Sequence, residues 1–322
     1  MRRPVLALLA FLIGFSPARA QAQDTYLLLI TGVSGEETLA AQYQKWGASV
    51  VDGAKKHGVP AANIIYLAEA TEKDTARIKA RSTRENVTQA FDDIAKRAKE
   101  GDEVFILLIG HGSFDGQAAS FNLPGPDLTA PDFAKLFERL FPQRIAFVNT
   151  ASSSGAFLEP LKGPRRVIVT ATKTGGERLD TRFPGFFVEA LENDAADRDK
   201  NGRVSVLEAF DYAKSKVVAA YEQGGHILTE HAMLEDGSEG KLAATVYLGP
   251  ERTRDAATTA AAAADPGLRA LFTQQDALER QVAELRLKKD SMDAAQYEAR
   301  LEKLLTDLAL KTKEIRDREA KK

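Results

Sequence analysis

Two stretches of the sequence hold side chains able to do nucleophilic or acid–base chemistry. His111 follows the apolar run 104–109 with a glycine on either side, and Ser152 closely follows a second apolar run, 144–149. An imidazole can act as a general base or acid, and a serine hydroxyl becomes a nucleophile when such a base takes its proton. The pair points to a hydrolytic site; a histidine in a plain glycine-rich turn is the alternative.

The elements that must position these side chains are buried strands. A continuous apolar run of this length, bounded by turn residues, predicts a strand buried on both faces. Similar runs at 26–31, 64–67 and 166–171 alternate with helical patterns. Alternation of this kind predicts an α/β fold, with a mostly parallel central sheet covered by helices on both faces. In such folds chemistry gathers outside the carboxyl ends of the strands, where His111 and Ser152 stand.

The helical patterns have recognisable boundaries. Ser82 and Glu85 have the spacing of a capping box, which predicts a helix start. An apolar stretch at 244–248 suggests an edge strand. Apolar residues at helical spacing predict further helices over 36–56, 133–141, 157–161, 186–192 and the segment after 208.

Residues 197–208 have the pattern of an EF-hand loop. Oxygen-bearing side chains stand at the ligand positions, Gly202 stands where the sharp turn falls, and helices are expected on both sides. The pattern predicts a calcium site, whereas a solvated acidic turn is the alternative. A single loop without an evident partner favours a structural brace over a sensor. The expected ligands are Asp197, Asp199, Asn201, the Arg203 carbonyl, Ser205 and Glu208.

Composition narrows the class of protein. The 322 residues are 44% hydrophobic and 28% charged, with a net charge of −2, which fits a globular protein and gives no sign of nucleic-acid binding. Residues 1–20 combine Arg2 and Arg3, a short apolar segment and Ala18-Arg19-Ala20, which predicts a secretory signal peptide. We therefore expect an exported, periplasmic or secreted protein with no membrane span in the mature chain. There is no cysteine, which excludes a thiolate nucleophile.

The C-terminal region differs in character from the rest. Residues 251–264 are rich in Ala and Thr and predict a linker after a domain spanning 24–250. Residues 265–322 carry apolar residues at spacings of three, four and seven among many charges, which predicts a helical hairpin or coiled coil. Ser291 and Asp293 favour a break with a new N-cap, against one long helix.

Taken together, the two stretches resemble a known family. The apolar strand followed by Gly110-His111-Gly112-Ser113, and the next followed by Ala151-Ser152-Ser153-Ser154-Gly155-Ala156-Phe157, resemble the caspase-fold cysteine peptidases, most closely the legumain-like branch. The resemblance spans about 26–248 and implies a caspase-like three-layer sandwich. It also implies that His111 matches the catalytic histidine and that Ser152 replaces the catalytic cysteine; shifting the alignment by one residue would place Ala151 there.

By the same resemblance, the oxyanion and substrate groups fall at Gly112, Ser154, Gly155 and Thr172. By the same resemblance the strand 166–171 would help line the substrate groove. The charged residues Lys173, Glu177, Arg178 and Arg182 follow that strand, and the sequence does not indicate which of them points inward. His231, with Glu230 as a neighbour, is a second candidate base. Asp115 is near His111 in sequence, but nothing indicates that it orients the imidazole.

Three hypotheses follow. The protein is a degenerate peptidase homologue that binds a peptide or protein in its groove, because the family nucleophile is missing. Alternatively, it is an active hydrolase with a Ser152/His111 dyad, in which His111 moves the proton. In the third, the C-terminal helices carry the function through self-association or a protein partner.

Overall fold

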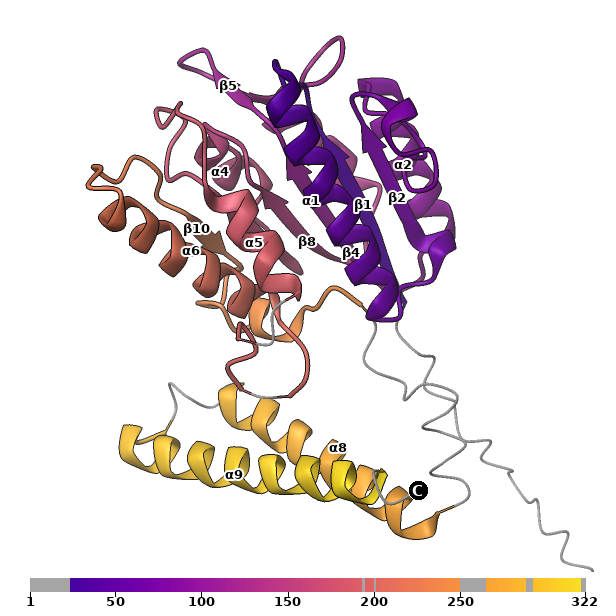
Figure 1. Cartoon of the computed structure of the whole chain (residues 1–322), viewed down its shortest axis with the longest axis vertical. Helices are drawn as coiled ribbons and strands as arrows, with labels where there is room; N and C mark the ends of the chain where they lie inside the picture. Colours follow the sequence, from indigo (N-terminus) through magenta and orange to yellow (C-terminus); the bar gives the residue numbers. More distant parts are fainter. Residues whose placement is uncertain (1–23, 193–194, 200, 250–264, 288–291, 320–322) are drawn as a thin grey trace, which may run out of the picture.

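The computed structural model describes residues 24–192, 195–199, 201–249, 265–287 and 292–319 (Figure 1). The predicted signal peptide and linker lie outside these residues, so both remain predictions. In the described part of the chain, none of the helices is both long and apolar enough to cross a membrane.

The domain is built on a seven-stranded sheet in the order β10-β9-β8-β4-β1-β2-β3. Every neighbouring pair is parallel except β9 and β10, which are antiparallel. The prediction of an α/β fold with a mostly parallel sheet is confirmed. The strands are β1 (Thr25–Thr31), β2 (Ile64–Ala68), β3 (Ala80–Arg81), β4 (Glu103–Ile109), β8 (Arg144–Asn149), β9 (Arg166–Thr170) and β10 (Met233–Glu235).

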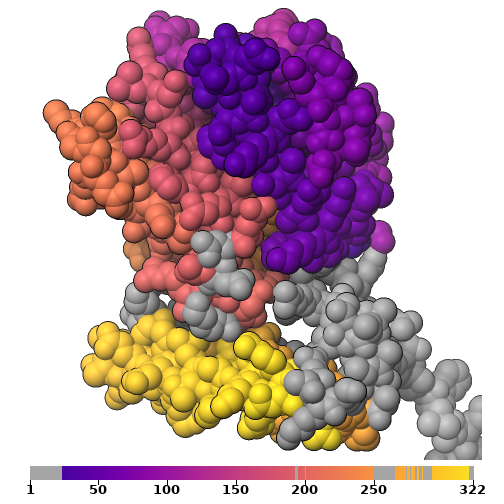
Figure 2. Space-filling model, in the orientation of Figure 1, coloured from indigo at the N-terminus to yellow at the C-terminus, as the bar shows by residue number. Residues whose placement is uncertain are grey.

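Helices cover both faces of this sheet because alternate strand residues point to opposite sides. Leu27 and Leu29 pack under α1 (Glu37–Lys56), α5 (Phe183–Glu192) and α6 (Val206–Gln223). Figure 2 shows part of this helical layer on the face turned to the viewer. Tyr26, Leu28 and Ile30 belong to the opposite core, with α2 (Arg84–Arg97), α3 (Ala130–Glu138) and α4 (Leu158–Leu161).

A small second sheet follows the central strand β4, in a stretch for which the sequence analysis predicted no strand. Its strands are β5 (Gly112–Phe114), β6 (Ala119–Phe121) and β7 (Leu128–Thr129), paired antiparallel in that order. Strand β5 begins directly after His111, so the imidazole lies between two strands rather than in an open loop. Asp115 accepts hydrogen bonds from the N–H groups of Gln117 and Ala118 in the β5–β6 turn.

Some boundary predictions are wrong: the helices predicted over 133–141 and 186–192 begin three residues earlier, and two further errors concern an N-cap and an edge strand. The N-cap of α2 is Thr83, whose hydroxyl accepts a hydrogen bond from the Asn86 N–H, whereas the Ser82 hydroxyl donates to the carbonyl of Thr31. The edge strand is β10 rather than 244–248, where the chain forms the short 3₁₀ helix η4 (Ala243–Thr245). These two further errors have one cause: a long-range contact competes with the local pattern. The remaining 3₁₀ helices are η1 (Ala61–Asn63), η2 (Thr71–Lys73) and η3 (Ser154–Phe157).

The described part of the C-terminal region contains two helices, α8 (Pro266–Leu287) and α9 (Ala294–Glu319). Asp293 caps α9, because its carboxylate accepts a hydrogen bond from the Gln296 N–H. Leu268 and Phe272 of α8 pack against Ile315 of α9 in a cluster of their own. The two helices therefore run antiparallel as a hairpin; a coiled-coil geometry remains a prediction.

Candidate functional site

His111 and Ser152 meet because the strands that precede them are neighbours. Strands β4 and β8 pair in parallel with Leu108 opposite Asn149, so both residues follow the same edge of the sheet. Together they line a small pocket of about 40 Å³, enough for one small chemical group. The other lining residues are Leu39, Tyr43, Trp46, Gly110, Asp180, Thr181 and Pro184.

The imidazole of His111 is held on both sides. Its Nδ1 lies 3.1 Å from Oδ1 of Asp180, and its Nε2 lies 3.2 Å from the carbonyl oxygen of Ser34. The Tyr43 hydroxyl is 3.3 Å from the same Nε2. An oxygen acceptor therefore lies within reach of each ring nitrogen. Neither contact is made to Ser152.

Tyr43 forms the inner wall of the pocket on α1. Its ring stacks on Trp46 and meets the His111 ring edge-on. Burial raises the pKa of its hydroxyl well above the usual value, and the nearby carboxylate of Asp180 adds to the effect. The hydroxyl therefore stays protonated at physiological pH and acts as a neutral hydrogen-bonding group.

Ser152 is turned toward the backbone of Gly112. Its Oγ donates to the Gly112 carbonyl at 3.0 Å and accepts from the Gly112 N–H at 3.2 Å. The residue is only 4% exposed. The Gly112 N–H, assigned by the resemblance to an oxyanion, is therefore occupied by the serine itself.

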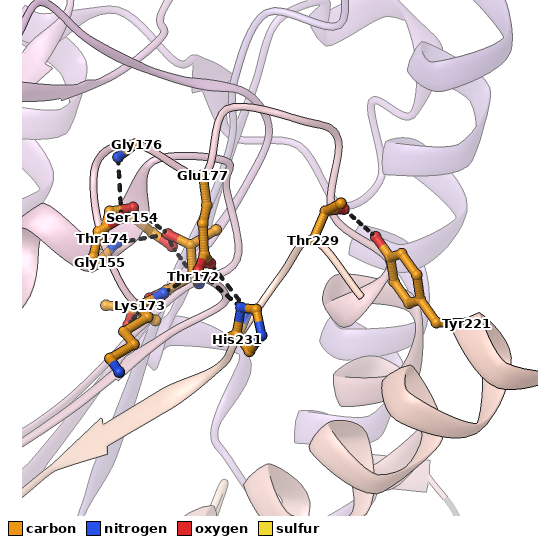
Figure 3. A network of polar contacts seen from close by, with 11 residues as sticks. Ser154, Gly155, Thr172, Lys173, Thr174, Gly176, Glu177, Tyr221, Thr229 and His231 are labelled. Carbon is orange, nitrogen blue, oxygen red and sulfur yellow. Dashed lines mark hydrogen bonds and ion pairs between the residues drawn. The ribbon is translucent and has the colours of Figure 1, made fainter. Parts of the chain in front are cut away.

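The other predicted oxyanion and substrate groups bind one another. Ser154 Oγ accepts from the N–H groups of Ala171 and Thr172, and the Gly155 N–H donates to Thr172 Oγ1 at 2.8 Å (Figure 3). Ser154 and Thr172 are fully buried. In this arrangement these groups fix the turn after β8 to the turn after β9 instead of facing a ligand.

Ser153 occupies the centre of this turn in a strained state. Its φ of 57° lies in the left-handed region, which costs free energy for a residue with a side chain. Its Oγ is buried with no hydrogen-bond partner among the described residues. Its N–H donates to the carbonyl of Glu177, in the loop after β9, at 2.7 Å.

His231 pairs with Glu177 and not with its sequence neighbour Glu230. His231 Nδ1 lies 2.9 Å from Glu177 Oε1, and the His231 N–H donates to Glu177 Oε2 (Figure 3). Glu230 is buried and accepts from the N–H groups of Arg182 and Phe183, so it caps the start of α5. Burial raises the pKa of Glu230, against the pull of those two donors.

The predicted calcium loop brings its carboxylates together. Single oxygens of Asp197, Asp199 and Glu208 lie within 4.8 Å of one another, and all three residues are at least nine-tenths buried. Gly202, at the predicted sharp turn, has a φ of 80° and donates its N–H to Asp197. Three buried carboxylates this close to one another are unfavourable without a cation, so the donor set fits a hard metal ion.

The loop pairs with a segment of its own chain near the end of the domain. Ser205 forms a β-bridge with Tyr247, and the Val206 N–H donates to the Val246 carbonyl at 2.9 Å. The Arg203 guanidinium lies 3.7 Å from the centre of the Tyr247 ring. Burial raises the pKa of Tyr247 to about 12, and the nearby charge of Asp199 contributes. The loop is therefore tied to residues 246–247 by backbone contacts.

Asp180 is the functional residue that sequence reasoning missed. It lies in the loop after β9, on an element remote in sequence from His111, and only the fold brings the two together. The one feature of the sequence that could have pointed to Asp180 is that it is an acidic residue shortly before the helix that follows the strand 166–171. Comparison of the chain with protein-family models finds no match, and comparison with curated proteins finds none either.

Proposed function

We propose that the protein is an exported, calcium-binding relative of the caspase-fold, legumain-like peptidases that binds a peptide or protein segment without cleaving it. The observation that carries the proposal is the separation of the two catalytic candidates. Ser152 Oγ is bonded to Gly112, whereas the ring nitrogens of His111 are bonded to Asp180 and Ser34. A hydrolase that used this dyad would need the Ser152 hydroxyl within hydrogen-bond reach of the His111 imidazole.

The chemistry of serine explains why this separation is decisive. A serine hydroxyl is a weak nucleophile unless a base accepts its proton during attack. Here the hydroxyl proton of Ser152 is directed to a backbone carbonyl, which is not a base. Nδ1 of His111 faces a carboxylate at 3.1 Å instead of the hydroxyl. The pocket is thus arranged to hold a group rather than to transfer a proton.

The family assignment rests on the two stretches and their placement. His111 and Ser152 follow neighbouring parallel strands, as the resemblance implies for the catalytic pair. The apolar wall of Leu39, Tyr43 and Trp46 beside them supports binding of a ligand side chain.

The test of this proposal measures reaction and binding separately. Wild type and Ser152→Ala are incubated with a fluorophosphonate probe and a random peptide library, with calcium present. We expect no labelling and no cleavage in either. Labelling of wild type that Ser152→Ala abolishes, with cleavage, would establish the alternative Ser152/His111 hydrolase.

Binding is then measured by affinity selection from the same library. Trp46→Ala removes part of the pocket wall and should abolish retention of the selected peptides. Phe141→Ala is the matched control, because Phe141 is 77% exposed and lies outside the pocket lining. If no peptide is retained by wild type, or if both variants retain them equally, the binding proposal fails.

Calcium is the proposed ion of the loop 197–208. The ligands would be Asp197, Asp199, Asn201, the Arg203 carbonyl, Ser205 and Glu208. When bound, the ion supplies positive charge that offsets the buried carboxylates. The residues themselves already shape the loop, since Ser205 and Glu208 form a capping box that begins α6. The pairing of the loop with 246–247 favours a structural brace.

Metal titration tests the ion. A site with a Kd near 10⁻⁴ M would stabilise the fold by about 2.7 kcal/mol at a hundredfold excess. We expect calcium to raise the thermal midpoint and Glu208→Gln to remove that rise. Glu222→Gln, an exposed carboxylate on the same helix, is the control. An equal rise in both variants would place the calcium effect elsewhere.

A further inference from the structure

We propose that residues 173–181 form a closed lid over the turn that carries Ser152, and that Glu177 and His231 are its latch. This inference deepens the proposed function. It rests on that function only for the identity of the ligand, a peptide segment, that would enter when the lid opens. The lid itself is argued from contacts at three places along its length.

The first place is the contact of the lid with the turn after β8. A Cβ atom on Gly155 would lie 2.2 Å from the backbone of Lys173, so the two backbones pack with no room for a side chain. The Ser153 N–H donates to the Glu177 carbonyl, and Thr181 Oγ1 donates to the Thr150 carbonyl at 2.6 Å. The turn is buried beneath these contacts.

The second place is the contact of the lid with the site itself. A Cβ on Gly175 would meet the Phe114 ring at 2.6 Å, so the lid rests on strand β5 directly beyond His111. Asp180, at the other end of the lid, makes the contact to His111 Nδ1. Closure of the lid therefore buries the turn and supplies the partner of the imidazole in one step.

The third place is the latch. Glu177 Oε2 accepts from the N–H groups of Lys173 and His231, and Glu177 Oε1 lies 2.9 Å from His231 Nδ1 (Figure 3). His231 comes from the segment before β10, so these contacts tie the lid to a separate part of the sheet edge. The His231 side chain is 48% exposed and the Glu177 side chain 19%, so the latch is open to solvent on one side.

The lid has the properties of a segment that opens. Within 173–181 there is no helix or strand, two adjacent glycines occur, and Leu179 is 62% exposed. Few buried apolar contacts and solvent-facing backbone place a segment at the low end of local stability. The buried Oγ of Ser153 below the lid has no hydrogen-bond partner among the described residues, and it gains one if the lid lifts and water or a ligand reaches the hydroxyl.

Hydrogen exchange of the full chain, without added peptide, tests the latch. His231→Ala and Glu177→Gln should each speed exchange in fragments covering 151–157 and 172–182 on the order of fivefold, which corresponds to the loss of about one partly exposed side-chain hydrogen bond. Exchange over 104–109 should not change. His226→Ala is the matched control, because His226 is an exposed histidine on the same segment.

Two results would overturn the inference: unchanged exchange at 151–157 in both latch variants, or equal acceleration over 104–109, which would indicate general destabilisation. Should His231→Ala fail to fold, Glu177→Gln alone decides, because it keeps the backbone of the lid and an oxygen acceptor. Exchange is measured without ligand, so failure of the lid is distinguishable from failure of peptide binding.

Discussion

Ser152 Oγ forms two hydrogen bonds with the backbone of Gly112, donating to its carbonyl oxygen and accepting from its N–H. The two residues follow neighbouring strands, β8 and β4, so the pair ties together the ends of both. Ser152 stands where a nucleophile is expected, but its hydroxyl holds together the two backbone segments that form the site.

This pairing predicts a structural cost for removing the hydroxyl. Ser152→Ala should lower the free energy of unfolding by about 1 kcal/mol, because both polar groups of Gly112 lose a partner. Urea denaturation measures the change. Ser113→Ala removes an exposed hydrogen bond to Asn122 and should cost less. Equal effects of the two substitutions would contradict the pairing.

Because another backbone lies close to Gly112, adding a single methyl group there should lower the free energy of unfolding more than Ser152→Ala does. A Cβ there would lie 2.2 Å from the Ser152 carbonyl oxygen, so Gly112→Ala should destabilise the protein by about 1–3 kcal/mol. Gly53 on α1 has nothing within 4 Å of its Cβ position, and Gly53→Ala should stabilise by about 0.5–1 kcal/mol. Two substitutions of the same kind should thus have opposite signs in urea unfolding, and a neutral Gly112→Ala would refute the packing.

The buried carboxyl of Glu230 should make the stability of the fold depend on pH, and the sign of this dependence follows from its raised pKa. Burial raises its pKa above 4.5, so the folded state binds more protons than the unfolded state in the window just above that value. The contribution of Glu230 to stability therefore falls as pH rises through its folded pKa. Glu230→Gln keeps an oxygen acceptor for the start of α5 without the charge.

The measurement compares urea unfolding of wild type and Glu230→Gln at pH 4.5 and pH 7. The stability difference should shift in favour of the variant at the higher pH. Glu222→Gln, at an exposed position on α6, should show no such shift. If the difference in unfolding free energy between wild type and Glu230→Gln is the same at both pH values, burial does not disfavour the charged form of Glu230.

We expect the sheet domain to fold with the same stability when the C-terminal helices are removed. Leu268, Phe272 and Ile315 form a core cluster separate from the two clusters of the sheet. A chain ending at Arg254 should therefore keep the thermal midpoint of the full chain. Size-exclusion with light scattering then compares the two masses. A drop larger than the mass removed would assign self-association to the helices, whereas a lowered midpoint would contradict independence.

The meeting of His111 and Ser152 could be predicted because it depends on local patterns. Each residue follows an apolar run, and parallel neighbouring strands bring their carboxyl ends to one edge. Asp180 could not be predicted, since its contact with His111 depends on the course of an irregular loop after a third strand. The same limit applies to Glu177 and His231, where sequence favoured the adjacent Glu230 as partner.

Local signals also failed where a distant group competed. Ser82 and Thr83 both have the side chain of an N-cap, and the distant Thr31 carbonyl decides between them by binding Ser82. The apolar stretch at 244–248 resembles a strand, but Val246 and Tyr247 pair with Val206 and Ser205 instead. The EF-hand pattern itself needs only one short segment, and its carboxylates do converge.

The two margins of the main sheet have a consequence for how copies of the protein can associate. Strand β3 has two residues and β10 has three, and they are the outermost strands of the seven. Margins this short offer too few free N–H and C=O groups to template a strand from a second molecule, which is a known defence against edge-to-edge aggregation. Edge-to-edge pairing of this seven-stranded sheet between two copies of the protein is therefore disfavoured.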